Sequence, residues 1–221
     1  MANLKPIVLH GHFSAPNPWK VVIILESLNI PYEHKFVDIA DVKKEPFILV
    51  NPNGRLPAIE DPNTGVTLWE SGAIVEYLVD TYDKEKKLTF DSVPEKYQLK
   101  QFLHFQVSGQ GPYFGQLVWF WRNHRDEVAV SRYEQEVLRV HSVLDKILEG
   151  KEYLVGNKLT YADIAFIPWD LYMQEGFTES SISEKSKAYP NFLAWYRRIK
   201  ADPSVAKSLG LREKAIAEQA K

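Results

Sequence analysis

The stretch that most constrains the fold is residues 51–74, NPNGRLPAIEDPNTGVTLWESGAI, because it combines two turns, two short apolar runs and a helix start. Residues 51–54 are all turn formers, so the chain loops there. Pro57 is tolerated at the first position of a strand, where its missing N–H is not needed. Residues 61–65 form a second turn, and residues 66–68 are the second apolar run. Together these signals predict a β-hairpin that begins at Pro57.

Glu70 and Ser71 then open an amphipathic helix. Its apolar positions fall at helical spacing: Ile74, Tyr77, Leu78 and Tyr82. A serine at a helix N-terminus can offer its hydroxyl and backbone N–H groups to an anion, and the neighbouring carboxylate of Glu70 suits an ammonium group. A ligand that carries a carboxylate and an ammonium on one carbon would satisfy both residues. The alternative is that Ser71 only caps the helix and that Glu70 faces water.

The chain before this stretch predicts a strand, a helix and a second strand. Residues 6–10 are a short apolar run typical of a buried strand, and residues 19–28 have apolar positions at helical spacing. Residues 32–38 alternate as a second strand, so the two strands should be parallel. A weak helix at residues 43–50 completes the order β-α-β-α-β-β-α.

A run of charged residues is followed by a proline-containing segment that would interrupt regular secondary structure, and together they predict a domain boundary at residues 85–95. After it the apolar periodicity is helical throughout. Residues 95–124 predict one long helix interrupted at residues 108–112, where a proline beside two glycines would kink it. A second helix is expected at residues 126–149.

A third helix of this region begins at Thr160. Thr160 is a good N-cap, and Asp163 stands where its carboxylate can bond back to the backbone N–H of the cap. A further helix is expected from Pro190 to Lys200. Beyond Arg212 the polar, Ala-rich chain predicts a trailing helix or a frayed tail.

Composition excludes several kinds of partner. The 221-residue chain is 45% hydrophobic with a net charge of −2, and no basic block suggests a nucleic-acid partner. Cysteine is absent, which removes disulfides, thiolate metal sites and a cysteine nucleophile, and the histidines lack metal-ligand spacing. No apolar run approaches the roughly 20 residues of a membrane helix, and the N-terminus lacks a signal core. We therefore expect a cytoplasmic protein with no membrane segment and no metal.

Two segments, NPNGRLPAI at residues 51–59 and WESGAIVEYL at residues 69–78, resemble the two glutathione-site signatures of the glutathione transferase superfamily. The resemblance implies an α/β thioredoxin-like domain at residues 1–85 that binds glutathione as a co-substrate. It also implies an all-α domain at residues 96–221 that contributes the second-substrate pocket and the interface of a homodimer.

The same resemblance implies roles for single residues. Leu56 would precede a cis-proline, Pro57, and pair its backbone with the cysteinyl part of glutathione. Glu70 and Ser71 would hold the γ-glutamyl end.

The site for the glycyl carboxylate departs from the family pattern. Relatives place a His, Gln or Lys where this chain has Val42, which cannot bind a carboxylate. Lys44, or its neighbour Lys43, would substitute as a point charge rather than a directional donor. The alternative is that both lysines belong to a solvated surface, and Arg55 is a further candidate.

Glutathione enzymes must stabilise a thiolate, because the free thiol has a pKa of about 8.5. No tyrosine precedes Tyr32 and no cysteine is present, so the tyrosine-type and omega-like classes are excluded. Two donors remain at the start of the first helix, Asn17 and Ser14. Their segment SAPNPWKV, together with SGQGPY at residues 108–113, resembles most the fungal class built around the prion-forming nitrogen regulator and its nu-class relatives. We expect Asn17 to be the main donor and Ser14 its helper.

The second substrate should be apolar, since aromatic side chains gather in the first loop and at the expected kink. We expect Phe13, Gln110, Tyr113 and Phe114 to line its pocket. The resemblance implies an enzyme that conjugates glutathione to apolar electrophiles, reduces disulfides with glutathione, or does both. The alternatives are a non-catalytic binding or regulatory protein of the same fold and a glutathione-dependent isomerase.

Overall fold

The computed structural model describes residues 4–219, which divide into two compact units. Residues up to Lys87 and residues from Asp202 onward form one unit, and residues Leu88–Ala201 form the other. We call them the sheet unit and the helical unit.

The sheet unit is built on four strands: β1 (Ile7–Gly11), β2 (Tyr32–Phe36), β3 (Ala58–Asp61) and β4 (Val66–Trp69), in the order β2-β1-β3-β4. The strand pair β1–β2 is parallel, with Ile7 opposite Tyr32, whereas β3 is antiparallel to both β1 and β4. This arrangement confirms the predicted βαβ unit and the hairpin. It brings the loop after β1 and the loop before β3 to neighbouring positions, because Leu9 of β1 pairs with Ile59 of β3.

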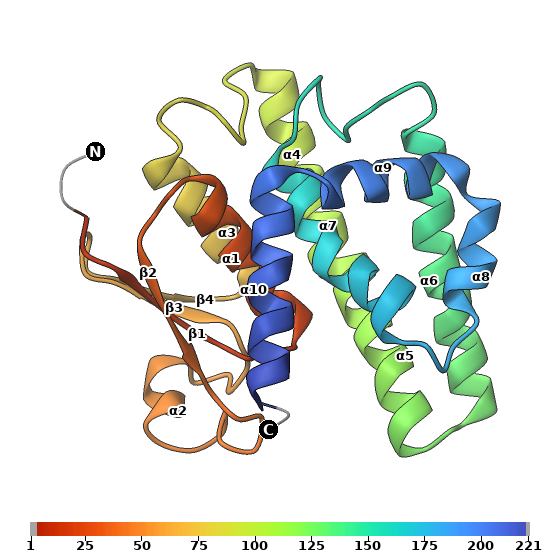
Figure 1. Ribbon diagram of the computed structural model, residues 1–221, viewed down its shortest axis with the longest axis horizontal. Helices are drawn as coiled ribbons and strands as arrows, with labels where there is room; N and C mark the ends of the chain where they lie inside the picture. The colour runs from red at the N-terminus through yellow and green to blue at the C-terminus, as the bar shows by residue number, and fades with distance from the viewer. Residues whose placement is uncertain (1–3, 220–221) are drawn as a thin grey trace. The chain divides into compact units, whose positions relative to one another are not determined.

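Helices cover both faces of this sheet. Figure 1 shows α1 (Pro16–Ser27) and α3 (Ser71–Tyr82) on one side and the short α2 (Phe47–Val50) on the other. Helix α1 begins three residues before the predicted range, because Pro16 suits the first helical position, where no N–H is required. The predicted helix at residues 43–50 is reduced to its last turn.

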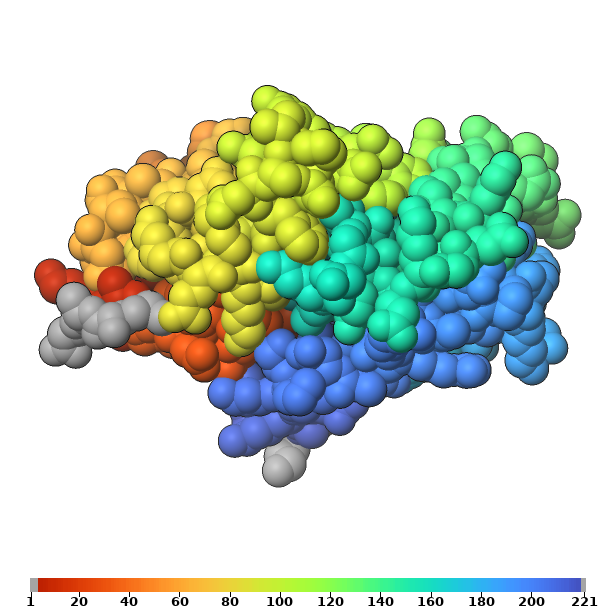
Figure 2. All heavy atoms as spheres, turned by 90° about the horizontal axis from the view of Figure 1, so that it is seen from above, coloured from red at the N-terminus to blue at the C-terminus, as the bar shows by residue number. Residues whose placement is uncertain are grey.

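The C-terminal helix α10 (Pro203–Gln219) belongs to the sheet unit, whereas the sequence analysis placed residues 96–221 in one helical domain. It packs along α1 and buries Val205 and Leu209. In Figure 2 its blue spheres lie beside the red and orange of the N-terminal chain. The prediction differed because a trailing polar sequence carries no sign of the partner that its apolar stripe will meet.

The helical unit contains α4 (Val93–Phe105), α5 (Gly111–Asn123), α6 (Glu127–Ile147), α7 (Tyr161–Leu171), α8 (Ile182–Lys185) and α9 (Pro190–Lys200). Two π-helical segments, η1 (Gln106–Gln110) and η2 (Tyr172–Gly176), and a short 3₁₀ helix, η3 (Ser186–Ala188), continue these helices. None of the helices within residues 4–219 is both long and apolar enough to cross a membrane.

The interruption predicted at residues 108–112 is the π-helical segment η1, which joins α4 to α5. Pro112 lies in the first turn of α5, where a proline is tolerated, and therefore does not break a continuous helix. The predicted capping box is present at the start of α7. Both oxygens of the buried Asp163 are used, because Thr160 N and Leu154 N donate to them at 3.0 and 2.9 Å.

Candidate functional site

The loop between β1 and α1 is organised by His12. The backbone N–H groups of Ser14 and Ala15 both donate to His12 Nδ1, at 3.2 and 3.3 Å. An Nδ1 atom that accepts such bonds carries no proton, so the ring proton lies on Nε2. Burial lowers the pKa of His12 below its usual value, against the opposing field of Asp38. The imidazole is therefore neutral at neutral pH and serves as an acceptor that fixes the loop.

The two predicted thiolate donors, Ser14 and Asn17, differ in their surroundings. The hydroxyl of Ser14 is 3.2 Å from His12 Nδ1, and its carbonyl oxygen accepts a bond from Arg212 of α10 at 2.8 Å. Ser14 is thus tied into the loop through its side chain and its backbone. Asn17 is half-buried in the first turn of α1.

The N-terminus of α1 has few backbone donors. Pro16 and Pro18 have no N–H, so Asn17 is the one residue among the first three helical positions that carries one. Ala15, the N-cap, provides no side-chain cap. Asn17 therefore lies at the positive end of the helix dipole. Both its amide and the dipole favour an anion such as a thiolate.

The loop before β3 is held in place by the hydrogen bonds of a buried asparagine. Asn51 Nδ2 donates to Arg55 O at 2.6 Å, and Asn51 Oδ1 accepts from Asn53 N at 2.9 Å. Gly54 adopts a φ of +61°, and a Cβ there would lie 2.9 Å from the carbonyl oxygen of Val42. The peptide bond between Leu56 and Pro57 is cis, which confirms the prediction; a second cis bond joins Glu45 to Pro46.

Glu70 has an unusual backbone. It is the N-cap of α3 with φ 73° and ψ 115°, a left-handed conformation that side chains with a Cβ rarely adopt. Its side chain is exposed, and Oε1 is 3.5 Å from Asn53 Nδ2. Ser71 follows as the first helical residue. The alternative was that Ser71 caps the helix and Glu70 faces water; Glu70 occupies the cap position, and its side chain is exposed.

The hydroxyl of Ser71 meets a buried lysine that the sequence analysis missed. Lys20 of α1 is 2% exposed, and its Nζ donates to Ser71 Oγ at 3.3 Å. Burial lowers the pKa of Lys20 to about 7, although the charge of Glu70 acts to raise it. The available signal was a lone cation between Trp19 and Val21, inside an otherwise apolar helical run.

Residues 41–46 offer little to the glycyl carboxylate. Val42 is buried against Phe47 and Ala58. The ammonium of Lys44 donates to Asp41 at 2.8 Å, and its side chain is 64% exposed. Both lysine predictions therefore stay predictions, and Lys44 would have to exchange Asp41 for the ligand.

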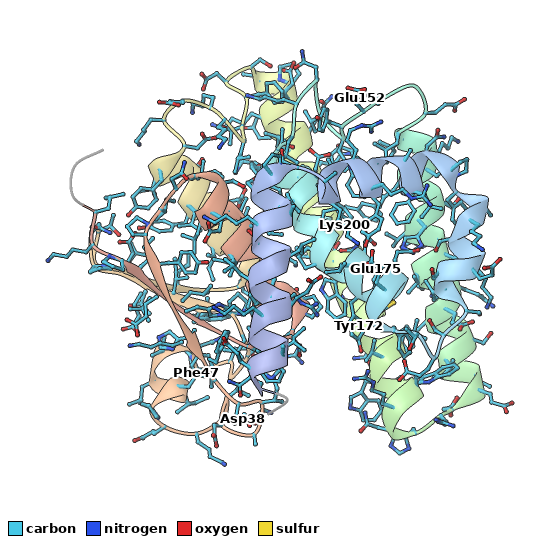
Figure 3. All side chains as sticks on the ribbon, in the orientation of Figure 1. Asp38, Phe47, Glu152, Tyr172, Glu175 and Lys200 are labelled. Carbon is cyan, nitrogen blue, oxygen red and sulfur yellow. The ribbon has the colours of Figure 1, made fainter. Side chains whose placement is uncertain are left out.

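A cleft of about 670 Å³ opens in the sheet unit, but none of the predicted glutathione residues lines it. Its wall includes Asp38 and Phe47, both labelled in Figure 3, and an imidazole–carboxylate pair, His10 Nε2 to Glu60 Oε1 at 2.7 Å. It lies beside α2, and the predicted site at the N-termini of α1 and α3 is separate from it.

The predicted second-substrate residues divide into two groups. Phe13 and Tyr113 are half-buried, and their rings lie 4.1 Å from His12 and 6.3 Å from Tyr133. Gln110 and Phe114 are completely buried, and their assignment to a second-substrate pocket stays a prediction.

The burial of Gln110 has a clear chemical reason. Its side-chain amide donates to Asp170 Oδ1 at 2.8 Å and to Phe166 O at 3.2 Å, and its oxygen accepts from Gln106 at 2.9 Å. The sequence pattern alone did not predict this buried polar network. No cluster of three metal-binding side chains occurs in the part of the chain that the structure describes.

Comparisons with known proteins agree with the two signatures. A family model described as "Glutathione S-transferase, N-terminal domain" matches residues 5–80, and one described as "Glutathione S-transferase, C-terminal domain" matches residues 111–203. The "Glutathione S-transferase-like protein OpS6" of Beauveria bassiana is 44% identical over 212 residues, which cover 94% of this chain and 96% of that protein. "Glutathione S-transferase 2" of Schizosaccharomyces pombe is also 44% identical, covering 89% and 92%.

Solved structures show the same relationship. The glutathione transferase URE2P6 of Phanerochaete chrysosporium, solved in complex with oxidized glutathione, is 40% identical with a TM-score of 0.89, covering 97% of this chain and all of that one. The structural neighbours are thus Ure2p-type glutathione transferases, which confirms the resemblance to the nitrogen-regulator class. The chain therefore belongs to the glutathione S-transferase family.

Proposed function

We propose that this chain is a glutathione-dependent enzyme that binds the γ-glutamyl end of glutathione at Glu70 and Ser71. The observation that carries the proposal is the left-handed backbone of Glu70 at the start of α3. Such strain is retained where the surroundings impose it, and it gathers at ligand sites. The carboxylate of Glu70 attracts an ammonium while the N-terminus of α3 attracts a carboxylate, so adjacent groups of both kinds fit there.

In this proposal the cysteinyl part pairs with the backbone of Leu56, beside Pro57, and the thiolate lies at Asn17. Support for Asn17 comes from its place at the uncapped, proline-flanked start of α1. Ser14 acts as a helper, because its hydroxyl already has a partner in His12. Lys44 remains the proposed contact for the glycyl carboxylate.

The activated thiolate would attack one of two kinds of apolar acceptor. With an electrophile, the sulfur bonds to carbon and a leaving group departs with the electron pair. With a disulfide, the sulfur bonds to one sulfur atom and expels the other as a thiolate, and a second glutathione completes the reduction. The relative URE2P6 was solved with oxidized glutathione, the product expected of the second reaction.

Two assays test the proposed function. The intact chain is passed over immobilised glutathione and then tested for turnover with a chlorodinitrobenzene and with a mixed disulfide of glutathione. We expect retention, elution by free glutathione, and turnover of at least one of the two substrates. Retention without turnover would favour the non-catalytic binding protein, and no retention would contradict the proposed site.

We also propose that the chain acts as a homodimer through α4 and its neighbours. Val93 and Tyr97 lie one turn apart on α4 and are 67% and 64% exposed, a large apolar surface for one helix face. Light scattering should give twice the chain mass, and Tyr97→Glu should lower it to the monomer. Val128→Glu, on the 81% exposed Val128 of α6, is the matched control and should leave the dimer intact. A wild-type monomer at micromolar concentration would contradict this proposal.

A further inference from the structure

Lys20 is a buried cation of the sheet unit. Its side chain lies in α1 among core residues such as Trp19, Val21 and Val22, and it is 2% exposed. An ammonium removed from water is costly unless charge or hydrogen bonds compensate it. A methionine or leucine would fill the same space without that cost. The residue is therefore a candidate for a role outside folding.

The hydrogen bond between Lys20 and Ser71 has a fixed direction when the lysine is charged. An ammonium group only donates, so Ser71 Oγ must be the acceptor in the 3.3 Å contact. The hydroxyl proton of Ser71 is then directed to another acceptor. Because Ser71 is the first residue of α3, that proton emerges beside the backbone N–H groups of the helix N-terminus.

Resting on the proposed function, we propose that Lys20 is a positioning residue for the γ-glutamyl carboxylate of glutathione and acts through Ser71. Because Lys20 donates to Ser71 Oγ, the hydroxyl proton of Ser71 is left to donate a hydrogen bond to the ligand. Lys20 also places a positive charge behind a site that already contains the Glu70 carboxylate. The ligand's carboxylate thus meets a charge-assisted donor instead of a neutral hydroxyl.

The protonation of Lys20 should then be linked to binding. Burial brings the pKa of Lys20 to about 7 in the free protein. A neutral amine can accept the Ser71 proton, which would withdraw the donor from the ligand. A bound carboxylate favours the ammonium and raises the pKa of Lys20, so binding takes up a proton and the affinity falls as the pH rises above about 7.

Charged side chains lie on the helices that pack against α1. Glu70, at the start of α3, acts to raise the pKa of Lys20. On α10, the other helix packed on α1, Lys207 pairs with Glu26 at 2.6 Å and Arg212 donates to the Ser14 carbonyl oxygen.

The test uses S-hexylglutathione, which has no free thiol to titrate, and calorimetry in two buffers of different ionisation enthalpy. Three variants are compared with the wild type: Lys20→Met, Ser71→Ala and the double variant. Lys20→Met should fold at least as well as the wild type, because it removes a buried charge at similar volume. At about pH 6 it should weaken binding about 10-fold or more, the loss of one charge-assisted contact.

Two further readouts separate positioning from packing. Near pH 8 the wild type should take up several tenths of a proton more than Lys20→Met on binding, roughly as expected for a group with a free pKa of about 7. In the Ser71→Ala background, Lys20→Met should change affinity by less than about 3-fold, because its partner is gone. Lys20→Arg, which cannot lose its proton, should abolish the extra proton uptake.

Three outcomes would overturn the inference. One is unchanged affinity in Lys20→Met while Ser71→Ala binds weakly. Another is an equal loss from Lys20→Met with and without Ser71, and the third is identical proton uptake in Lys20→Met and the wild type. A wild-type protein that does not bind S-hexylglutathione at all would instead contradict the proposed function.

Discussion

At the scale of single residues, Asn17 and Ser14 differ in where the fold places them. The Ser14 hydroxyl lies 3.2 Å from His12 Nδ1, and that nitrogen also organises the loop backbone. Asn17 stands at the start of α1 between two prolines that restrict its backbone. A fixed amide donor at a positive helix terminus is suited to a thiolate.

Asn17→Ala should therefore lower turnover by roughly 10²-fold, in line with the loss of one oxyanion-type donor. Ser14→Ala should have a smaller effect, because the loop keeps its bonds to His12 and Arg212. The measurement is the steady-state rate at saturating glutathione for both variants. A larger loss in Ser14→Ala than in Asn17→Ala would place the chain with the serine-type classes.

Two substitutions of Glu70 test its role in ligand binding and its effect on stability separately. Glu70→Ala removes the carboxylate but keeps a Cβ at φ 73°, whereas Glu70→Gly also relieves that backbone. Both should raise the dissociation constant for glutathione about 10- to 150-fold, the worth of a charge-assisted contact of about 1.5–3 kcal/mol.

The same two variants should differ in stability. Glu70→Gly should be more stable than Glu70→Ala by about 1 kcal/mol, since glycine accepts a positive φ without strain. Calorimetric titration measures the affinity, and urea denaturation measures the stability. Wild-type affinity in either variant would reject Glu70 as part of the site.

At the scale of elements, the start of α7 depends on one buried carboxylate. Asp163 accepts bonds from Thr160 N, Leu154 N and Trp195 Nε1, the last two at 2.9 Å. Burial raises the pKa of Asp163, while these hydrogen bonds act to lower it. The residue joins the capping box to the 154 loop and to α9.

Asp163→Ala should destabilise the helical unit by at least about 3 kcal/mol, because Asp163 accepts from four buried donors, the Thr160 hydroxyl included, and each donor left unpaired costs about 1–3 kcal/mol. Asp126→Ala is the matched control: its carboxylate caps α6 at the surface, bonded to Ala129 N at 2.8 Å. That change should cost about 1 kcal/mol. Equal urea midpoints for the two variants would show that the buried network contributes nothing.

Helix α10 offers a second matched pair. Leu209 is 6% exposed within the sheet unit, while Leu211, two residues later, is 37% exposed. Leu209→Ala should lower the free energy of unfolding by about 2–5 kcal/mol and Leu211→Ala by much less, because a cavity forms only at the buried site. Thermal unfolding followed by circular dichroism measures both. Similar midpoints would contradict the packing of α10 on the sheet unit.

The elements that the sequence predicted well are those with local signals. The hairpin, the start of α3 and the capping box of α7 each have turn or cap residues that act on their immediate neighbours. The π-helical form of residues 106–110 and the packing of α10 depend on distant contacts that no local pattern records.

The residues of the candidate site also divide into those with local sequence signals and those that depend on distant contacts. Leu56, Glu70 and Ser71 were predicted from contiguous motifs, whereas Lys20 contacts Ser71 across 51 residues of sequence. Sequence alone could not predict that Gln110 and Phe114 are completely buried, because an aromatic-rich kink has the same pattern whether it faces solvent or the core. Burial of Gln110 depends on Asp170, 60 residues later.

At the scale of the whole molecule, the chain has a net charge of −2, no cysteine and the two domains of the glutathione S-transferase family. In the proposed function the reactive sulfur comes from glutathione, and the protein lowers the pKa of the bound thiol at the start of α1. The start of α3 and Lys20 hold the γ-glutamyl end of the same ligand.

The most direct measurement is the pKa of the glutathione thiol in the saturated complex, followed by the ultraviolet absorbance of the thiolate as the pH is raised. The account predicts a bound pKa at least about one unit below the free value of roughly 8.5 in the wild type. It predicts a return toward that value in Asn17→Ala. A bound thiol that titrates in the wild-type complex as it does free in solution would contradict the account.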